Sequence, residues 1–183
     1  PRKVLFGNPD RAMPRLSPDG ARLAFLAPLD GVLNVWVGPA DNPAAARAVT
    51  NDTVRGIRFY TWAYTNEHIL YIQDRAGDEN WRLYGVDLQG GTTQDLTPLE
   101  GVQALVQKAD YQHPGEVIVG LNDRVPEYHD LYRIDIQSGA RQLLQENSGG
   151  FADFDVDDDY RVRLASRITA DGGIEILKPD GQG

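Results

Sequence analysis

Short apolar runs alternate with polar turns along the whole chain, and one nine-residue pattern occurs twice. The sequence LYGVDLQGG at residues 83–91 returns as LYRIDIQSG at residues 131–139, which is 48 residues later. Leu, Tyr, Asp, Gln and the closing Gly are identical in the two copies, and the two intervening apolar positions exchange only among Val, Leu and Ile. A period of this length is typical of repeat proteins. The pattern therefore predicts a repeat architecture.

Each repeat reads as a series of short strands bounded by turns rich in Asp, Gly and Pro. Leu23, Ile69 and Val117 occupy matching strand positions at intervals of 46 to 48 residues. Residues 1–14 show no such pattern, and we expect them to form an irregular lead-in strap. The strands expected in the successive repeats are residues 22–26, 34–37 and 46–50; 56–62, 68–72, 83–88 and 95–97; 104–106, 116–119, 131–136 and 141–144; and 151–154, 161–166 and 174–177.

Four short strands in every 40 to 50 residues are the signature of a β-propeller blade. The sequence therefore predicts an all-β fold, a partial β-propeller of four-stranded antiparallel blades over residues 15–183. The blades are expected at roughly 15–52, 53–100, 101–147 and 148–183, with the last one incomplete. A β-sandwich fits less well because it predicts no internal identity at 48 residues. The single Ala-rich run, residues 43–48, is too short for more than one helical turn.

The composition excludes several classes of function. The chain has 18 Lys and Arg against 27 Asp and Glu, a net charge of −9, so it lacks the basic patch that a nucleic acid or an anionic membrane surface requires. It has no cysteine, which excludes disulfides and thiolate metal sites but fits either a cytoplasmic or a periplasmic location. No run approaches the roughly 18 apolar residues of a membrane-spanning helix.

No catalytic residue, cofactor site or metal site is predicted from the motifs. A nucleophile elbow requires Gly-x-Ser-x-Gly, and the nearest segment, residues 147–150, lacks the leading Gly, so we interpret it as a loop between blades. His68, His113 and His129 show no spacing suited to a metal pair, and we expect structural roles for them. The acidic residues 153–159 invite a calcium site, but they lack the Gly and terminal Glu of an EF-hand loop.

Two polar loops are the best candidates for contact with a substrate. Asp78 and Glu79 precede the first copy of the nine-residue pattern, and Arg124 and Glu127 precede the second. Equivalent loops of adjacent blades emerge on the same face of a propeller, where carboxylates would meet a peptide amino terminus and the arginine a carbonyl or carboxylate. The alternative is that both loops are solvated turns with local caps, because loops are polar by default.

An ordered set of segments resembles the propeller of the prolyl oligopeptidase family of serine peptidases, on the dipeptidyl and acylaminoacyl peptidase side. The resemblance covers essentially the whole chain, although SPDG alone is shared with the periplasmic propellers of the Tol system. The segments are LFGNP at 5–9, RLSPDG at 15–20, LAFLAP at 23–28, NVWV at 34–37, DENWRLY at 78–84 and VRLAS at 162–166.

The resemblance implies that this propeller precedes an α/β-hydrolase domain with a Ser-Asp-His triad and restricts access to it, so that small peptides reach the nucleophile. No segment of the chain matches the hydrolase domain, so we expect the chain itself to be inactive. Its implied partners are that domain of the same parent chain and peptide substrates. The chain has no adjacent Glu-Glu pair of the kind with which dipeptidyl peptidases hold the substrate amino terminus. The alternative is a TolB-like propeller that binds a protein. In either case open blade edges predict self-association.

Overall fold

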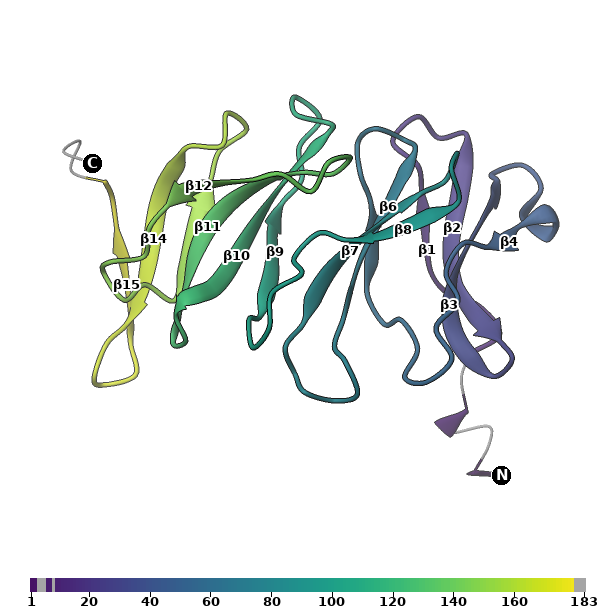
Figure 1. Cartoon of the computed structure of the whole chain (residues 1–183), viewed down its shortest axis with the longest axis horizontal. Coiled ribbons are helices and arrows are strands. Elements are labelled where there is room, and N and C mark those ends of the chain that lie inside the picture. Colours follow the sequence, from purple (N-terminus) through teal and green to yellow (C-terminus); the bar gives the residue numbers. More distant parts are fainter. Residues whose placement is uncertain (3–5, 8, 180–183) are drawn as a thin grey trace. The chain divides into compact units, whose positions relative to one another are not determined.

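The computed structural model describes residues 1–2, 6–7 and 9–179, and within them the chain forms antiparallel sheets (Figure 1). It divides into two compact units. The first consists of Pro1–Glu79 and Leu83–Asp95, and the second of Asn80–Arg82 and Leu96–Gly183. The expected all-β class is confirmed, and the Ala-rich run forms only a short 3-10 helix, η1 (Pro43–Ala45). No helix among the described residues has the length and apolar character needed to cross a membrane.

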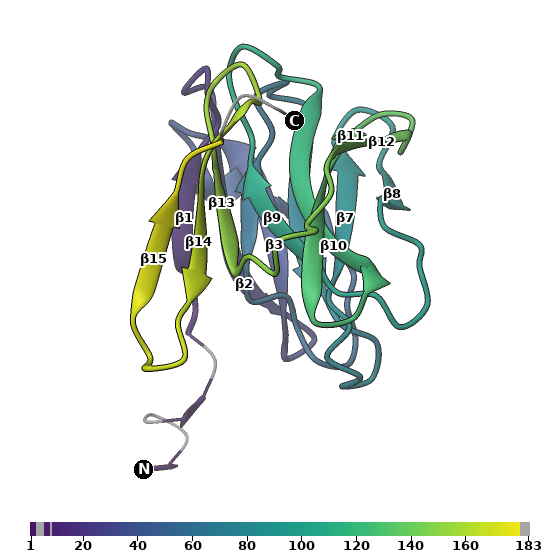
Figure 2. The same cartoon turned by 90° about the vertical axis from the view of Figure 1, so that its left-hand side faces the viewer.

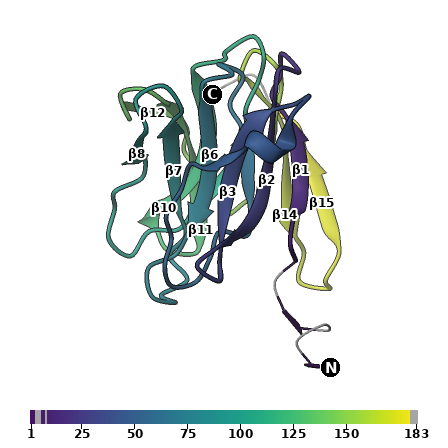
Figure 3. The ribbon, with the colours of Figure 1, turned by 90° about the vertical axis from the view of Figure 1, so that its right-hand side faces the viewer.

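The first sheet has the order β1-β2-β3-β4, and Figure 3 shows β1, β2 and β3 side by side. Its strands are β1 (Ala12–Leu16), β2 (Arg22–Leu29), β3 (Val32–Pro39) and β4 (Arg47–Ala48). β2 and β3 pair without interruption from Arg22 opposite Pro39 to Leu29 opposite Val32. The tight turn between them places Asp30 and Gly31 at positive φ, as a two-residue hairpin requires.

The second sheet has the order β5-β6-β7-β8 and shares a core with the first sheet. Its strands are β5 (Tyr60–Trp62), β6 (His68–Gln73), β7 (Arg82–Asp87) and β8 (Thr92–Asp95). Ala24, Val35, Ile57, Ile69 and Val86 are fully or almost fully buried in that core. Apolar residues on both strands of a hairpin thus pack between sheets, as expected for inner strands covered on two sides.

The second unit contains a four-stranded and a three-stranded sheet, seen from another side in Figure 2. The strands of the first are β9 (Ala104–Lys108), β10 (Glu116–Val125), β11 (Tyr128–Asp135) and β12 (Arg141–Gln145). Those of the second are β13 (Asp153–Val156), β14 (Val162–Ile168) and β15 (Ile174–Leu177). Ile118 and Leu131 of the larger sheet pack with Phe154, Tyr160 and Ala165 of the smaller one.

The nine-residue pattern forms the third strand of a sheet and the turn after it, in both copies. The shared Asp caps the turn through its backbone carbonyl, which accepts a hydrogen bond from the closing Gly at 2.9 Å in the pair Asp87–Gly91 and 2.8 Å in the pair Asp135–Gly139. Both glycines have positive φ, 66° and 71°, a conformation that favours Gly. The identical residues of the pattern therefore include those that close this turn.

The prediction of an irregular lead-in strap over residues 1–14 is wrong for residues 12–14, because residues 12–16 form strand β1. Met13 and Pro14 hid this strand, since a proline has no N–H for a sheet ladder. The structure accommodates Pro14 at the edge of the sheet, where the pairing with β2 is irregular between Ala12 and Arg15. The early part of the strap at residues 3–5 and 8, part of the LFGNP segment and the turn expected at 179–181 lie wholly or partly outside the described residues.

Candidate functional site

The loop between β6 and β7 holds Asp78 and Glu79 in an ordered turn. The carboxylate of Asp78 accepts a hydrogen bond from the backbone N–H of Arg75 at 3.1 Å, and the backbone N–H of Asp78 donates to the carbonyl of Arg75 at the same distance. Glu79 is exposed with a positive φ of 58°, and its backbone N–H donates to the buried carboxylate of Asp74 at 3.4 Å. Arg55 also contacts Asp74, with 3.3 Å between Nε and Oδ1. The loop is thus held by a buried carboxylate that sequence reasoning overlooked.

The expected loop position is wrong for Arg124, which lies within strand β10 because the β10–β11 hairpin extends to Val125, whereas Glu127 lies in the turn of that hairpin. The guanidinium of Arg124 binds the carboxylate of Asp130 through two hydrogen bonds, Nε to Oδ2 at 2.7 Å and Nη2 to Oδ1 at 2.8 Å. Nη2 also donates to the carbonyl of Asn147 at 3.1 Å, while Nη1 lies 3.6 Å from Glu146. Glu127 lies exposed in the two-residue turn. Arg124 therefore has a fixed orientation, in which each of its three guanidinium nitrogens lies near an oxygen of Asp130, Asn147 or Glu146.

The electrostatics of this hairpin follow from the Arg124–Asp130 pair. Hydrogen bonds from Arg124 hold the pKa of Asp130 below its usual value, against the opposing effect of burial, and they raise the pKa of Arg124. Burial lowers the pKa of the neighbouring His129, whose Nε2 is buried and has no hydrogen-bond partner. At neutral pH this places an ionised pair beside a neutral imidazole.

The structure also identifies a recurring buried polar position directly before each third-strand pattern. Asn34, Arg82 and Asp130 are spaced by 48 residues and are 0%, 2% and 2% exposed. Asn34 binds Thr50 and Asp52, Arg82 binds Glu100 at 3.1 Å, and Asp130 accepts a hydrogen bond from the backbone N–H of Asn147 at 2.7 Å. In each case the partner lies in the segment that leaves the sheet. Spacing could have revealed this position, but its three different residue types concealed it.

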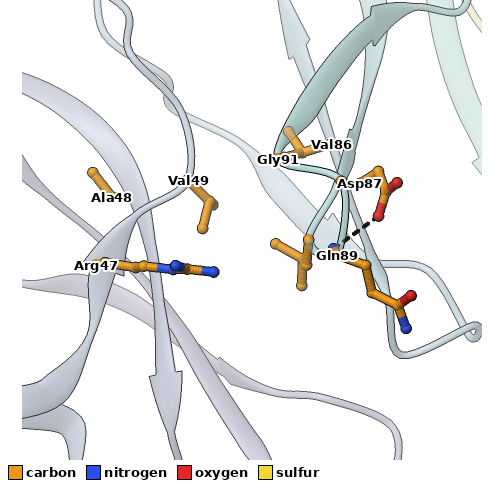
Figure 4. A pocket seen from close by; sticks show the side chains of 9 residues that line it. Arg47, Ala48, Val49, Val86, Asp87, Gln89 and Gly91 are labelled. Carbon is orange, nitrogen blue, oxygen red and sulfur yellow. Dashed lines mark hydrogen bonds between the residues drawn. The ribbon is translucent and has the colours of Figure 1, made fainter.

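A cavity of about 330 Å³ lies within the first unit, between β4 and the β7–β8 turn (Figure 4). Arg47 and Val49 line one side, and Val86, Asp87 and Gln89 line the other. The carboxylate of Asp87 accepts a hydrogen bond from the backbone N–H of Gln89 at 2.8 Å and thereby stabilises the turn between β7 and β8. None of the described residues that line this space is a histidine or carries a nucleophilic hydroxyl. The described lining of this cavity therefore offers neither a nucleophilic hydroxyl nor an imidazole base for acyl transfer.

A second cavity of about 470 Å³ lies within the second unit, between the segment after β12 and the three-stranded sheet. The apolar residues Phe151, Phe154 and Leu177 line it, together with the polar residues Glu146 and Ser148. The segment that most nearly resembled a nucleophile elbow is here the link between β12 and β13. Since no histidine is among the described residues that line this cavity, they offer Ser148 no imidazole as a general base.

The other residues weighed for chemistry have structural contacts within the chain. His68 Nδ1 lies 3.0 Å from the hydroxyl of Thr65, and His113 stacks on Tyr160 with 4.5 Å between the ring centroids. In the acidic segment, Asp157 accepts hydrogen bonds from backbone N–H groups of its own turn, and Asp158 binds Lys108 at 2.6 Å. Within the described part of the chain, no group of three or more potential metal ligands gathers.

Two curated relatives match the chain over essentially its whole length. It is 48% identical over 182 residues to dipeptidyl aminopeptidase BIII of Pseudoxanthomonas mexicana, a match that covers 100% of the chain and 26% of that protein. It is 32% identical over 187 residues to dipeptidyl peptidase family member 6 of Caenorhabditis elegans, covering 98% of the chain and 25% of that protein. The chain thus spans about a quarter of the length of these relatives. No protein-family model matches it.

Solved structures share the fold at lower sequence identity. The β-propeller domain of the Trilobed protease from Pyrococcus furiosus, described as having an open velcro topology, aligns with a TM-score of 0.62 and 17% identity over 95% of this chain and 55% of that one. TolB from Acinetobacter baumannii aligns with a TM-score of 0.56 and 14% identity over 92% and 43% of the two chains. The predicted β-propeller fold is confirmed, and so is the resemblance to peptidases of the dipeptidyl peptidase kind.

Proposed function

We propose that this chain, a β-propeller portion related to dipeptidyl peptidases, is the non-catalytic part of a prolyl oligopeptidase family serine peptidase and filters peptide access to a hydrolase domain of the same parent chain. The observation that carries the proposal is the 48% identity to a dipeptidyl aminopeptidase over 100% of the chain. The two cavities support it as well, because the described residues of neither one combine a nucleophile with a histidine. Acyl transfer would then take place on residues outside this chain.

Four exposed residues, Asp78, Glu79, Arg124 and Glu127, are proposed to face the substrate. Asp78, Glu79 and Glu127 would offer carboxylates to a peptide amino terminus, and the guanidinium of Arg124 would donate to a peptide carbonyl or carboxylate. The pair Arg124–Asp130 supports this role for the arginine, since a guanidinium held at 2.7 and 2.8 Å has little orientational freedom left to lose on binding.

The test uses the longer protein that carries this chain and compares it with residues 1–183 alone. We expect the long protein to cleave dipeptidyl anilides and the 183-residue chain to show no turnover. In the long protein, Glu127→Gln and Arg124→Lys should raise KM with kcat nearly unchanged, because they weaken ground-state binding. Gln137→Glu, on an exposed turn after β11, is a control expected to change neither. Turnover by the 183-residue chain that disappears in Ser148→Ala would overturn the proposal.

A TolB-like protein-binding propeller is the second candidate, favoured by the structural likeness to TolB. The identity of 14% to TolB, against 48% to the dipeptidyl aminopeptidase, supports the peptidase instead. The two functions differ in the sequence expected after residue 183. A Gly-x-Ser-x-Gly segment there supports the peptidase, and a chain that ends with further blades supports the binding module.

A further inference from the structure

The link between β4 and β5, residues 49–59, carries an arginine that reaches the loop after β6. The Nε of Arg55 lies 3.3 Å from Oδ1 of Asp74, the residue that directly follows β6. The side chain of Asp74 is 1% exposed, whereas that of Arg55 is 40% exposed. Both residues belong to the first unit. Arg55 therefore supplies the counter-charge that a buried carboxylate needs.

The same guanidinium lies against the backbone of the loop. A Cβ added to Gly77 would be 2.5 Å from Nη1 of Arg55, so a larger residue at position 77 would displace the arginine. Gly77 also has a φ of 88°, in the region that favours glycine. Arg55 thus contacts the loop at two points, the carboxylate at its start and the glycine at its middle.

The loop needs such contacts because its backbone adopts a conformation that its own residues disfavour. Ala76 and Glu79 have φ values of 53° and 58°, a region that residues with a Cβ seldom adopt. A conformation of this kind persists only where surrounding groups hold it. One such group is the carboxylate of Asp74, whose Oδ2 accepts a hydrogen bond from the backbone N–H of Glu79 at 3.4 Å. Arg55 contacts the other oxygen of that carboxylate and thereby fixes its orientation.

Arg55 is itself held by the link that carries it. Its backbone N–H donates a hydrogen bond to the carboxylate of Asp52 at 3.0 Å. The buried side chain of Asn34 binds the backbone of Asp52 twice, accepting from the N–H at 2.7 Å and donating to the carbonyl at 2.9 Å. A series of contacts therefore runs from β3 of the first sheet, through the link, to the loop of the second sheet.

We propose that Arg55 is a positioning residue, which holds the loop after β6 in the conformation in which Asp78 and Glu79 receive the amino terminus of a peptide. Arg55 acts through the loop and does not itself contact the peptide. This inference rests on the proposed function, since it requires that the two carboxylates face the substrate. Carboxylates on a fixed loop bind an ammonium group more tightly than carboxylates on a mobile one, because less conformational freedom is lost on binding.

The first test removes the side-chain contacts of Arg55 in the longer protein that carries this chain. Arg55→Met keeps the backbone N–H that binds Asp52 but removes the counter-charge of Asp74. The KM for a dipeptidyl anilide should rise about three- to tenfold with kcat nearly unchanged, because the loop must then be ordered on binding. Arg55→Lys keeps a positive charge and should recover most of that loss. Arg47→Met removes another exposed arginine of the first unit and is a control expected to change neither constant.

Two further measurements separate positioning from a general contribution to stability. In a variant that already carries Asp78→Asn and Glu79→Gln, Arg55→Met should have almost no effect on KM, because the carboxylates that it positions are gone. In the otherwise unmodified protein, Arg55→Met should speed trypsin cleavage after Arg75, which lies inside the loop, because cleavage follows the population of the open loop. Arg47→Met should leave the cleavage rate after Arg75 unchanged.

The outcomes distinguish this inference from the proposed function. If the double variant Asp78→Asn/Glu79→Gln raises KM but Arg55→Met does not, the carboxylates face the substrate and the positioning role is refuted. An unchanged rate of cleavage after Arg75 in Arg55→Met, or an equal rise in KM with and without the two carboxylates, would also refute it. If the double variant leaves KM unchanged, the substrate-facing role of the loop fails, and the inference fails with it.

Discussion

Replacing Asp130 by asparagine tests whether the hairpin that carries Arg124 is held by a buried ion pair. Asp130 is 2% exposed and accepts three hydrogen bonds, two from Arg124 and one from the backbone N–H of Asn147. In Asp130→Asn the amide nitrogen replaces one oxygen, so a donor faces the donor Nε or Nη2 of Arg124.

The expected loss of stability is about 2 kcal/mol. Hydrogen bonds to charged groups contribute about 1.5–3 kcal/mol each, and a larger sum is not expected because the Arg124 side chain is 39% exposed and water can solvate it after the change. Asp159→Asn is the matched control, because Asp159 pairs with Arg161 at 3.6 Å with both side chains more than half exposed. It should cost less than about 0.5 kcal/mol.

The effect should also depend on pH with a defined sign. The pKa of Asp130 is lowered in the folded chain, chiefly by Arg124, so the unfolded chain binds a proton at this residue more readily. The stabilisation is therefore complete above about pH 4, the usual aspartate range, and disappears as the pH falls through the lower folded value. The difference between the unmodified chain and Asp130→Asn should shrink over that same interval.

Hydrogen exchange of the β10 and β11 amides at several urea concentrations measures the loss within the second unit. A double-mutant cycle with Arg124→Met isolates the pair, since each single variant removes the same interaction. A coupling energy below about 0.5 kcal/mol would refute the reasoning. So would an Asp159→Asn variant as destabilised as Asp130→Asn.

Three further predictions concern stability, and each is checked by urea unfolding. Gly38→Ala should destabilise the chain by about 1–3 kcal/mol, because a Cβ there would lie 2.6 and 2.8 Å from backbone atoms of Ala46. Gly115→Ala is the control and should be neutral or slightly stabilising, since nothing lies within 4 Å of its added Cβ. Equal effects of the two substitutions would contradict this prediction. His129 has a pKa lowered by burial, so stability should rise with pH up to about 6.5 and then level off, and His129→Gln should flatten that rise; an unchanged slope would count against it. Asn34→Ala should lower the free energy of unfolding by about 2 kcal/mol or more, because the hydroxyl of Thr50 and the backbone N–H of Asp52 lose their acceptor. A loss below about 0.5 kcal/mol would contradict this and show that water takes the place of the Asn34 side-chain oxygen.

The repeated pattern predicted the sheets because its constraints are local. The apolar positions of a strand and the Asp and Gly that close a turn act within about nine residues, so both copies could be recognised without knowledge of tertiary contacts. β1 escaped because its constraints are not local: the backbone carbonyl of Met13 accepts a hydrogen bond from the hydroxyl of Tyr60 at 2.5 Å, and that of Arg15 accepts one from the indole N–H of Trp62 at 3.0 Å. A strand stabilised from the next sheet cannot be read from its own five residues.

The candidate substrate-facing residues show the same difference between local features, which the sequence predicts, and tertiary contacts, which it does not. The sequence placed Asp78, Glu79, Arg124 and Glu127 in polar loops; all four are exposed in the structure, but Arg124 lies within strand β10. It did not predict that Arg124 is bound to Asp130, because the partner lies on the next strand and its acidity alone does not distinguish it from the chain's other carboxylates. Their role toward a substrate remains a prediction.

The buried position shared by Asn34, Arg82 and Asp130 explains how the repeats can diverge in sequence while keeping one geometry. Each residue meets the same requirement, a hydrogen bond from the third strand to the segment that leaves the sheet, with a different chemical group. A neutral amide needs only neutral partners, whereas a buried charge needs a counter-charge. Asp130 therefore requires Arg124, and Arg82 requires Glu100. The acid at this position in the third repeat, Asp130, therefore holds an oriented arginine, Arg124, near the tip of the β10–β11 hairpin. A buried structural position can in this way give one hairpin a charged group that the corresponding hairpins lack.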